Sequence, residues 1–171
     1  MCSLATPYTY GVANICNGLL CFVDNRDARA PVLVFNPATG ETLVLPDAPP
    51  LTTDGHQHLF ALGFSPPDNE YKLFRLSFPL PYSYSSYDEE QVVDVDVYTL
   101  GDAARGWRKH FFLSPSRPTT TGINASAPVL IDGKLHVLTR GWRSWIRPEA
   151  TGVLVVDVFS ETCRTYPLRT R

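Results

Sequence analysis

Prolines and glycines punctuate this chain along its whole length, and that pattern limits its fold more than any other feature. The 171 residues include 15 prolines and 11 glycines. Proline removes a helical hydrogen bond and clashes with the preceding turn, and glycine weakens a helix interior. The short runs that remain between them are rich in Val, Leu, Phe and Tyr, which is typical of strands. We therefore predict an all-β chain.

Twelve runs qualify as strands. They cover residues 8–15, 19–23, 32–36, 42–45, 59–64, 71–78, 92–100, 107–113, 127–131, 134–139, 153–159 and 163–168. Two of the intervening turns carry Asn17-Gly18 and Asp132-Gly133. Both dipeptides favour the two-residue type I′ hairpin, because both of its central residues need a positive φ.

The same order of strands and turns occurs more than once. CNGLL at 16–20 matches IDGKL at 131–135, and VLVFN at 32–36 matches VLVVD at 153–157. Each copy continues into a polar turn with a Glu-Thr pair and ends at a proline, Pro46 or Pro167. A middle unit fits more loosely and gives a period of about 60 residues, the size range of propeller repeats.

A repeat of four antiparallel strands indicates one blade of a β-propeller, kelch-like in size. The blades would cover roughly 8–46, 59–113 and 127–168, within a single domain over 1–171. A β-sandwich would also give many short strands. The match between the first and third units favours blades, so the predicted fold is a partial propeller of about three blades.

Three blades fall short of the 4–8 that typically close a propeller. The outer faces of the terminal blades would then expose apolar side chains. Three arrangements remain open: a piece of a longer domain, a chain that self-associates, or outer units that curl into a compact, sandwich-like half.

A series of short motifs runs through almost the whole chain. They are NGLLCF (17–22), VFNPATGE (34–41), LGFSP (62–66), NEYKL (69–73), VYTLG (97–101) followed by WR (107–108), IDGKL (131–135) and DVFSET (157–162). In this order they resemble the F-box-associated domain of plant F-box proteins, a kelch-like propeller. The resemblance implies a non-enzymatic domain that binds a protein substrate, of unknown identity, for a Skp–cullin–F-box type ubiquitin ligase. The alternatives are a propeller-type enzyme and a non-functional, truncated gene product.

The start of the sequence departs from that family pattern. Members usually carry a helical F-box ahead of this domain, whereas Met1 precedes the first predicted strand by only a few residues. We therefore expect no F-box and no binding to the ligase adaptor from this chain. It would recognise a partner but not recruit the ligase.

The net charge and the cysteines indicate which binding partners and which cellular compartment to expect. The net charge of −2 gives no global attraction to nucleic acid or to an acidic membrane. We expect no signal peptide from residues 1–4, and the sequence has no apolar run of about 20 residues. Cys2, Cys16, Cys21 and Cys163 form no zinc-binding pattern, so free thiols, buried at Cys16 and Cys21, are expected. We expect an intracellular protein, cytoplasmic or nuclear, without a cofactor.

Two pairs of polar residues could support chemistry. His56 and His58 would share a strand face, but no ligand cluster surrounds them, so a histidine pair in a loop without a metal is expected. Asp94 and Asp96 could act as an acid–base pair, although a solvated strand face is far commoner. No nucleophile elbow or phosphate-binding glycine motif appears. We therefore predict no catalytic or metal-ligating residue.

Two aromatic clusters occur in long predicted loops. One contains Tyr82, Tyr84 and Tyr87, and the other contains Trp142, Arg143 and Trp145. Tyr, Trp and Arg are enriched at binding hot spots, although such residues can also pack within their own loops. In a four-stranded meander the second-to-third and blade-to-blade connections emerge at one end, and here most of them are long. We predict that these six residues contact the partner there.

Overall fold

The computed structural model describes residues 9–24, 27, 30–50, 56–79, 91–114, 116–118, 127–141 and 152–168. These residues form strands and turns, and none of them lies in a helix. Over this part of the chain, therefore, no helix is long and apolar enough to cross a membrane. The prediction of an all-β fold is confirmed.

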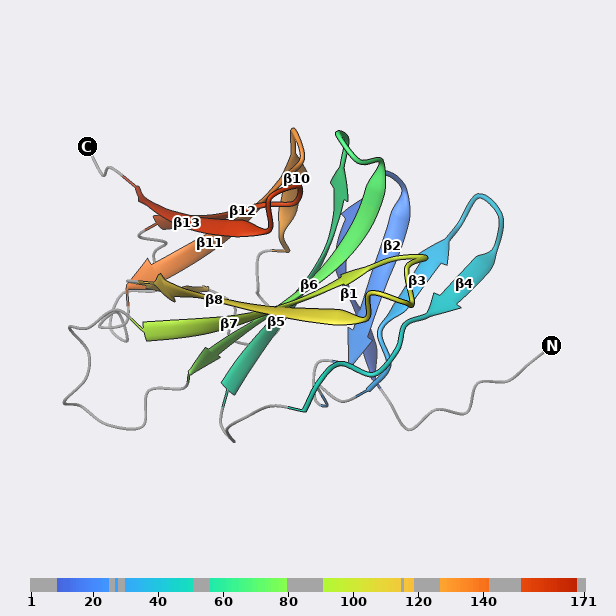
Figure 1. Ribbon diagram of the computed structural model, residues 1–171, viewed down its shortest axis with the longest axis horizontal. Coiled ribbons are helices and arrows are strands. Elements are labelled where there is room, and N and C mark those ends of the chain that lie inside the picture. Colours follow the sequence, from blue (N-terminus) through green and yellow to red (C-terminus); the bar gives the residue numbers. More distant parts are fainter. Residues whose placement is uncertain are drawn as a thin grey trace.

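Three antiparallel meanders follow one another along the chain (Figure 1). The first sheet contains β1 (Tyr10–Cys16), β2 (Leu19–Asp24), β3 (Leu33–Asn36) and β4 (Glu41–Val44). The second contains β5 (His56–Ser65), β6 (Glu70–Pro79), β7 (Gln91–Thr99) and β8 (Trp107–Ser114). The third contains β10 (Val129–Ile131), β11 (Lys134–Gly141), β12 (Gly152–Asp157) and β13 (Thr162–Pro167). We call these sheets the first, second and third blades, and they confirm the predicted partial propeller.

The third blade has one strand more than predicted. The short strand β9 (Ser116–Pro118) pairs antiparallel with β11, where Pro118 lies opposite Thr139. β10 occupies only the other end of β11, opposite residues 134–136, so β9 continues the same side of that strand. Three residues that end in proline carry no strand signal of their own, and the pairing depends on a partner far along the sequence.

The two predicted type I′ turns are present. Asn17 and Gly18 have φ angles of 49° and 83°, and Asp132 and Gly133 have 48° and 71°. Asn and Asp tolerate this left-handed region better than other residues with a side chain, and glycine adopts it freely. The turn residues therefore set the register of β1 on β2 and of β10 on β11.

The second blade lies between the other two, in green and yellow in Figure 1. One core fills the space between the first and second blades and includes Cys16, Val34, Leu62 and Leu73. A separate core fills the space between the second and third blades and includes Phe74, Val95, Leu135, Leu154 and Val156. Face-to-face packing of neighbouring sheets through apolar side chains is the arrangement expected of adjacent blades.

Burial along single strands reflects this order of blades. In β6 every residue from Lys72 to Phe78 is buried, as expected of a strand covered on both faces. In β12 buried and half-buried residues alternate, because one face of the third blade is covered by the second blade and the other is not. This agrees with the expectation that the terminal blades have uncovered outer faces.

The uncovered face of the first blade is apolar. Its cross-strand pairs form two rows, Val12–Phe22–Leu33–Val44 and Ile15–Leu20–Phe35–Thr42. Val12, Ile15 and Val44 are among the exposed large apolar side chains. A continuous apolar sheet face of this kind is costly to leave in water.

Cys16 and Cys21 are buried free thiols, as predicted. Burial raises the pKa of Cys16 to about 11. Burial and then the neighbouring Cys16 raise the pKa of Cys21 to about 12. Both residues therefore serve as small apolar side chains in the core between the first and second blades.

Asn14 links the innermost strands of the first two blades. The register of β1 on β2 shifts between Val12 and Asn14, and the Asn14 side chain points toward β5. Its Nδ2 donates to the Leu62 carbonyl at 2.8 Å, and its Oδ1 accepts from the Leu62 N–H at 2.9 Å. One buried side chain thus satisfies both backbone groups of an edge residue, as a neighbouring strand would.

Candidate functional site

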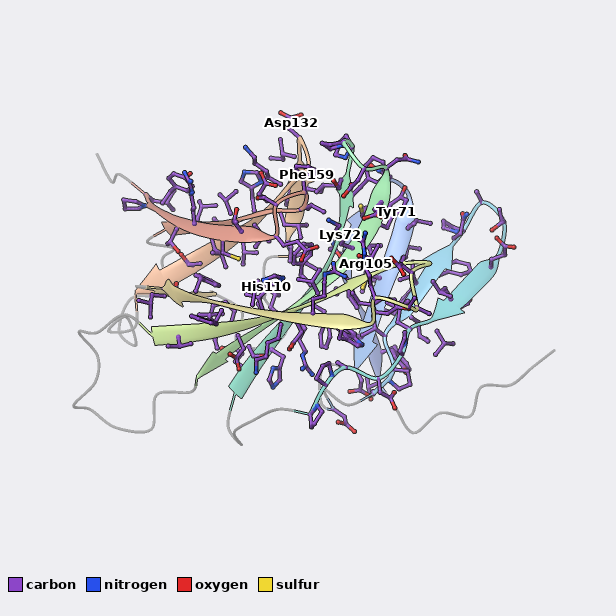
Figure 2. The ribbon with its side chains drawn as sticks, in the orientation of Figure 1. Tyr71, Lys72, Arg105, His110, Asp132 and Phe159 are labelled. Atoms are coloured by element: carbon purple, nitrogen blue, oxygen red, sulfur yellow. The ribbon has the colours of Figure 1, made fainter. Side chains whose placement is uncertain are left out.

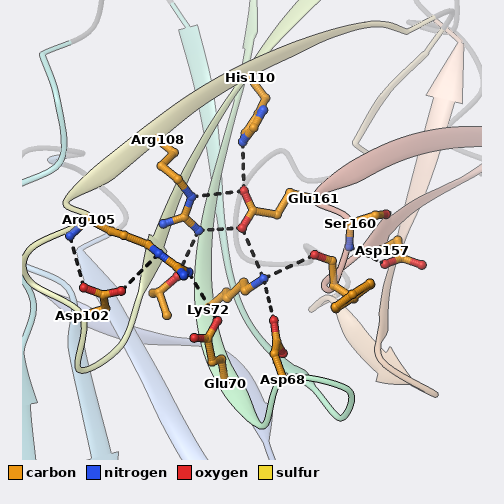
Figure 3. A network of polar contacts seen from close by, with 12 residues as sticks. Asp68, Glu70, Lys72, Asp102, Arg105, Arg108, His110, Asp157, Ser160 and Glu161 are labelled. Carbon is orange, nitrogen blue, oxygen red and sulfur yellow. Dashed lines mark hydrogen bonds and ion pairs between the residues drawn. The ribbon is translucent and has the colours of Figure 1, made fainter.

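The short turns of the second and third blades meet in a cluster of charged side chains centred on Glu161 (Figure 3). Arg108 donates from Nη2 to Glu161 Oε1 at 2.6 Å and from Nε to Oε2 at 3.3 Å. His110 Nε2 lies 2.9 Å from Oε2. Lys72 Nζ lies 3.3 Å from Oε1. One carboxylate of the third blade is therefore contacted by three side chains from two strands of the second.

Glu161 occupies an unusual backbone position. The turns 37–40, 66–69 and 158–161 each join two strands through four residues, and each ends in a residue with positive φ. That residue is Gly40 at 76°, Asn69 at 55° and Glu161 at 57°. Glycine and asparagine suit the left-handed region, whereas glutamate adopts it at a cost. The third blade keeps a strained residue at the position where its carboxylate reaches the second blade.

Lys72 is the most buried cation of the cluster, with 4% of its side chain exposed. Its ammonium lies 3.3 Å from Asp68 Oδ2 and donates to the Phe159 carbonyl at 3.4 Å. Figure 2 shows Lys72 below Phe159, which belongs to the β12–β13 turn. Two carboxylates and a carbonyl offset the cost of burying this charge.

The electrostatics of the cluster favour its ionised form. Burial raises the pKa of Glu161, but hydrogen bonds and positive charge from Arg108, followed by hydrogen bonds from His110 and Lys72, outweigh that effect and hold its pKa below the ordinary value. Arg105 extends the polar surface to Asp102 and Glu70 at 3.2 and 3.7 Å. These side chains thus contact one another in two groups, and we interpret the group around Glu161 as an ionic clasp between the second and third blades.

A second ion pair corrects the prediction that Asp94 and Asp96 form a solvated face. Both lie on the side of the second blade that faces the first, but Arg75 and Asp96 each expose only 3% of their side chains. Arg75 donates to Asp96 Oδ2 from Nε at 3.0 Å and from Nη2 at 2.7 Å, and Nη2 also donates to the Pro49 carbonyl. Asp94 is half-buried and pairs with Lys109 at 3.1 Å. The linker at Pro49 meets Arg75, and local sequence gave no sign of this contact.

The histidine pair lies at the start of strand β5 rather than in a loop. His58 Nδ1 is 3.0 Å from the Ser77 hydroxyl on the neighbouring strand. The side chain of His56 is outside the described part of the structure. Within the described residues, no three His, Cys, Asp or Glu side chains gather closely enough to hold a metal ion.

All six predicted contact residues fall outside the described residues: Tyr82, Tyr84, Tyr87, Trp142, Arg143 and Trp145. The strands that flank them are described. Segment 80–90 connects β6 to β7, and segment 142–151 connects β11 to β12. Both connections therefore leave their blades at the end opposite the short turns. Their contact role remains a prediction.

One exposed apolar group lies at the start of β7 and the end of β8 and was not singled out by the sequence. Phe111 and Leu113 on β8 expose 77% and 57% of their surface. Val92 is the cross-strand partner of Leu113 and is also exposed. The residues HFFL lie within the predicted strand 107–113, for which no exposure was predicted, and the position of β8 at the outside of the second blade leaves Phe111 and Leu113 in solvent.

Comparison with known proteins agrees with this architecture. The sequence profile of the F-box associated beta propeller domain matches residues 2–145. An Arabidopsis thaliana protein named "Putative F-box protein At5g50220" is 37% identical over 78 residues, which are 44% of this chain and 18% of that protein. The matched region thus spans less than a fifth of that relative. No solved structure matches the chain.

Proposed function

The chain belongs to the F-box associated β-propeller domain family, and on that premise we propose that it is a non-enzymatic protein-binding domain. Its partner would be a protein substrate of a Skp–cullin–F-box type ubiquitin ligase. The matched Arabidopsis protein carries the name of an F-box protein, which supports this role. We also propose that the chain acts inside the cell, in the cytoplasm or nucleus.

The topology of the blades supports placing the binding surface at the end with the long connections. At the opposite end, the charged side chains of the clasp around Glu161 are occupied with one another. Long connections on a rigid scaffold are where binding residues usually lie. The segments 80–90 and 142–151 both start and finish at the same end of their blades. This shared origin is the observation that carries the proposal.

A pull-down from a plant cell extract tests it. The full chain, Tyr84→Ala and Trp145→Ala are compared with Thr39→Ala, a control in the exposed turn between β3 and β4. A hot-spot aromatic costs about 2 kcal/mol when truncated, which is about thirtyfold in affinity. We expect the two loop variants to lose a partner that the control retains. If Thr39→Ala alone loses the partner while both loop variants fold and bind fully, the binding surface does not lie at the end with the long connections.

A further inference from the structure

We propose that the chain binds an extended segment of its protein partner along the free edge of β8. Apolar side chains of that segment would pack on Phe111 and Leu113. The inference rests on the protein-binding role proposed above, and it adds the mode of recognition and the chemistry of the bound segment.

Between Trp107 and Leu113, β8 has a neighbouring strand on one side only among the described residues. The strand runs from Trp107 to Ser114 and pairs with β7 along its whole length, while no described strand pairs with its other side. Along an antiparallel strand, alternate residues direct N–H and C=O groups to opposite sides. About half of these groups in β8 therefore point away from β7. A peptide in extended conformation has the matching spacing and can add as a further strand.

The outer edges of the other two blades are better protected. β4 has only four residues, and β13 carries Arg164 and ends at Pro167. Short edges, charged side chains and proline are the features that prevent unwanted strand pairing. β8 has eight residues and no proline. Its charged residues Arg108 and Lys109 lie in its first half and are engaged in ion pairs with Glu161 and Asp94, and its stretch from Phe111 to Leu113 is uncharged. Among the outer edge strands β4, β8 and β13, β8 therefore offers the longest edge and the one with an uncharged apolar stretch.

The side chains of β8 differ between its two faces. Arg108 and His110 point toward the third blade and contact Glu161. On the other face, Phe111 and Leu113 lie two residues apart and are largely exposed. A strand added at about 4.8 Å would place its own side chains directly beside them. The bound segment should therefore carry apolar residues at alternate positions opposite Phe111 and Leu113.

The location of this edge agrees with the proposed binding end. Leu113 pairs with Val92, the second residue of β7, and β7 directly follows segment 80–90. Exposed apolar surface is thus continuous from Val92 across Leu113 to Phe111 at the end of the blade where the long connections emerge. A partner held by those connections would have its extended segment within reach of β8.

A phage-displayed library of random peptides of about ten residues, long enough for one strand, tests this mode with the full chain as target. Selected peptides are then measured on wild type, on Phe111→Asp and Leu113→Asp, and on Tyr166→Asp. Tyr166 is the matched control, since it is an exposed aromatic residue on the outer strand β13. Urea midpoints of the variants show that each folds, as expected for residues this exposed.

We expect selected peptides to bind Phe111→Asp about thirtyfold more weakly, since an aromatic hot spot would be lost. They should bind Tyr166→Asp unchanged and slow hydrogen exchange at amides between Lys109 and Leu113. Three results would overturn binding along the β8 edge. These are a library that yields no binder, binders that bind both β8 variants as well as wild type, and binders that leave the β8 amides unprotected from exchange. The pull-down with Tyr84→Ala and Trp145→Ala would still decide the protein-binding role, so the two failures are distinguishable.

Discussion

Replacing Glu161 should separate the ionic clasp between the second and third blades from the strain of the turn that carries it. Glu161→Ala keeps a side chain in the left-handed region and removes the carboxylate. Removing one partner of a fully buried ion pair costs about 3–5 kcal/mol. This cluster is partly exposed, Lys72 keeps Asp68, and Arg108 keeps its bond to Thr99 at 3.0 Å. We therefore expect a loss of about 2 kcal/mol in the free energy of unfolding.

Glu161→Gly removes the same carboxylate but relieves the backbone. A left-handed conformation costs an L-residue about 1–2 kcal/mol. Relief of that cost is partly offset, because glycine gives the unfolded chain more conformational freedom and so lowers stability by about 0.4–1 kcal/mol. The net gain over alanine is about 1 kcal/mol, so Glu161→Gly should lose only about 1 kcal/mol relative to wild type. Gly40 at the equivalent turn of the first blade shows that the turn accepts glycine.

Acid should weaken the clasp in a direction set by the pKa of Glu161. Its folded pKa lies below the ordinary value of 4.5, so its contribution is complete above that value and is lost as the pH falls through the folded pKa. Glu161→Gln has no carboxylate to protonate at this position. The stability difference between wild type and Glu161→Gln should be largest near neutral pH and should shrink below about pH 4.5.

Urea unfolding at one fixed protein concentration measures all three variants, because association would otherwise shift the apparent stability. Two results would refute the reasoning. If Glu161→Gly is no more stable than Glu161→Ala, the turn is not strained by glutamate. If Glu161→Ala costs less than about 0.5 kcal/mol, within the range of ordinary surface substitutions, the cluster does not hold the two blades together.

Three further predictions follow from the packing of the blades. Gly63→Ala should cost about 1–3 kcal/mol by urea unfolding, because a Cβ there would lie 2.6 Å from Val158 Cγ2, and Val158→Ala in the same chain should recover part of that loss. The chain should self-associate through the apolar outer face of the first blade, and Ile15→Asp should shift its sedimentation toward monomer; a wild type that stays monomeric over a wide concentration range would contradict this. Cys16 and Cys21 should resist alkylation of the native chain at neutral pH, because burial raises their pKa values to about 11 and 12, and they should react once the chain is unfolded in urea.

The local rules of the sequence were sufficient for strands and tight turns. Asn17-Gly18 and Asp132-Gly133 adopt the predicted positive φ angles, and Gly40 ends its turn in the left-handed region. The period of short apolar runs was enough to predict three four-stranded meanders. These features depend on residues a few positions apart, so their physical cause is contained in the local sequence.

Contacts between blades depended on the tertiary structure. The Arg108–Glu161 bond joins residues 53 positions apart, and the bond from Lys72 to Phe159 spans 87. Asp96 looked like a solvated carboxylate, yet Arg75 and the linker at Pro49 enclose it. The sequence predicted uncovered outer faces on the terminal blades without indicating which side chains of each strand would face a neighbouring blade. The stacking order of the blades decided this, because burial and ion pairing depend on which strands meet in space.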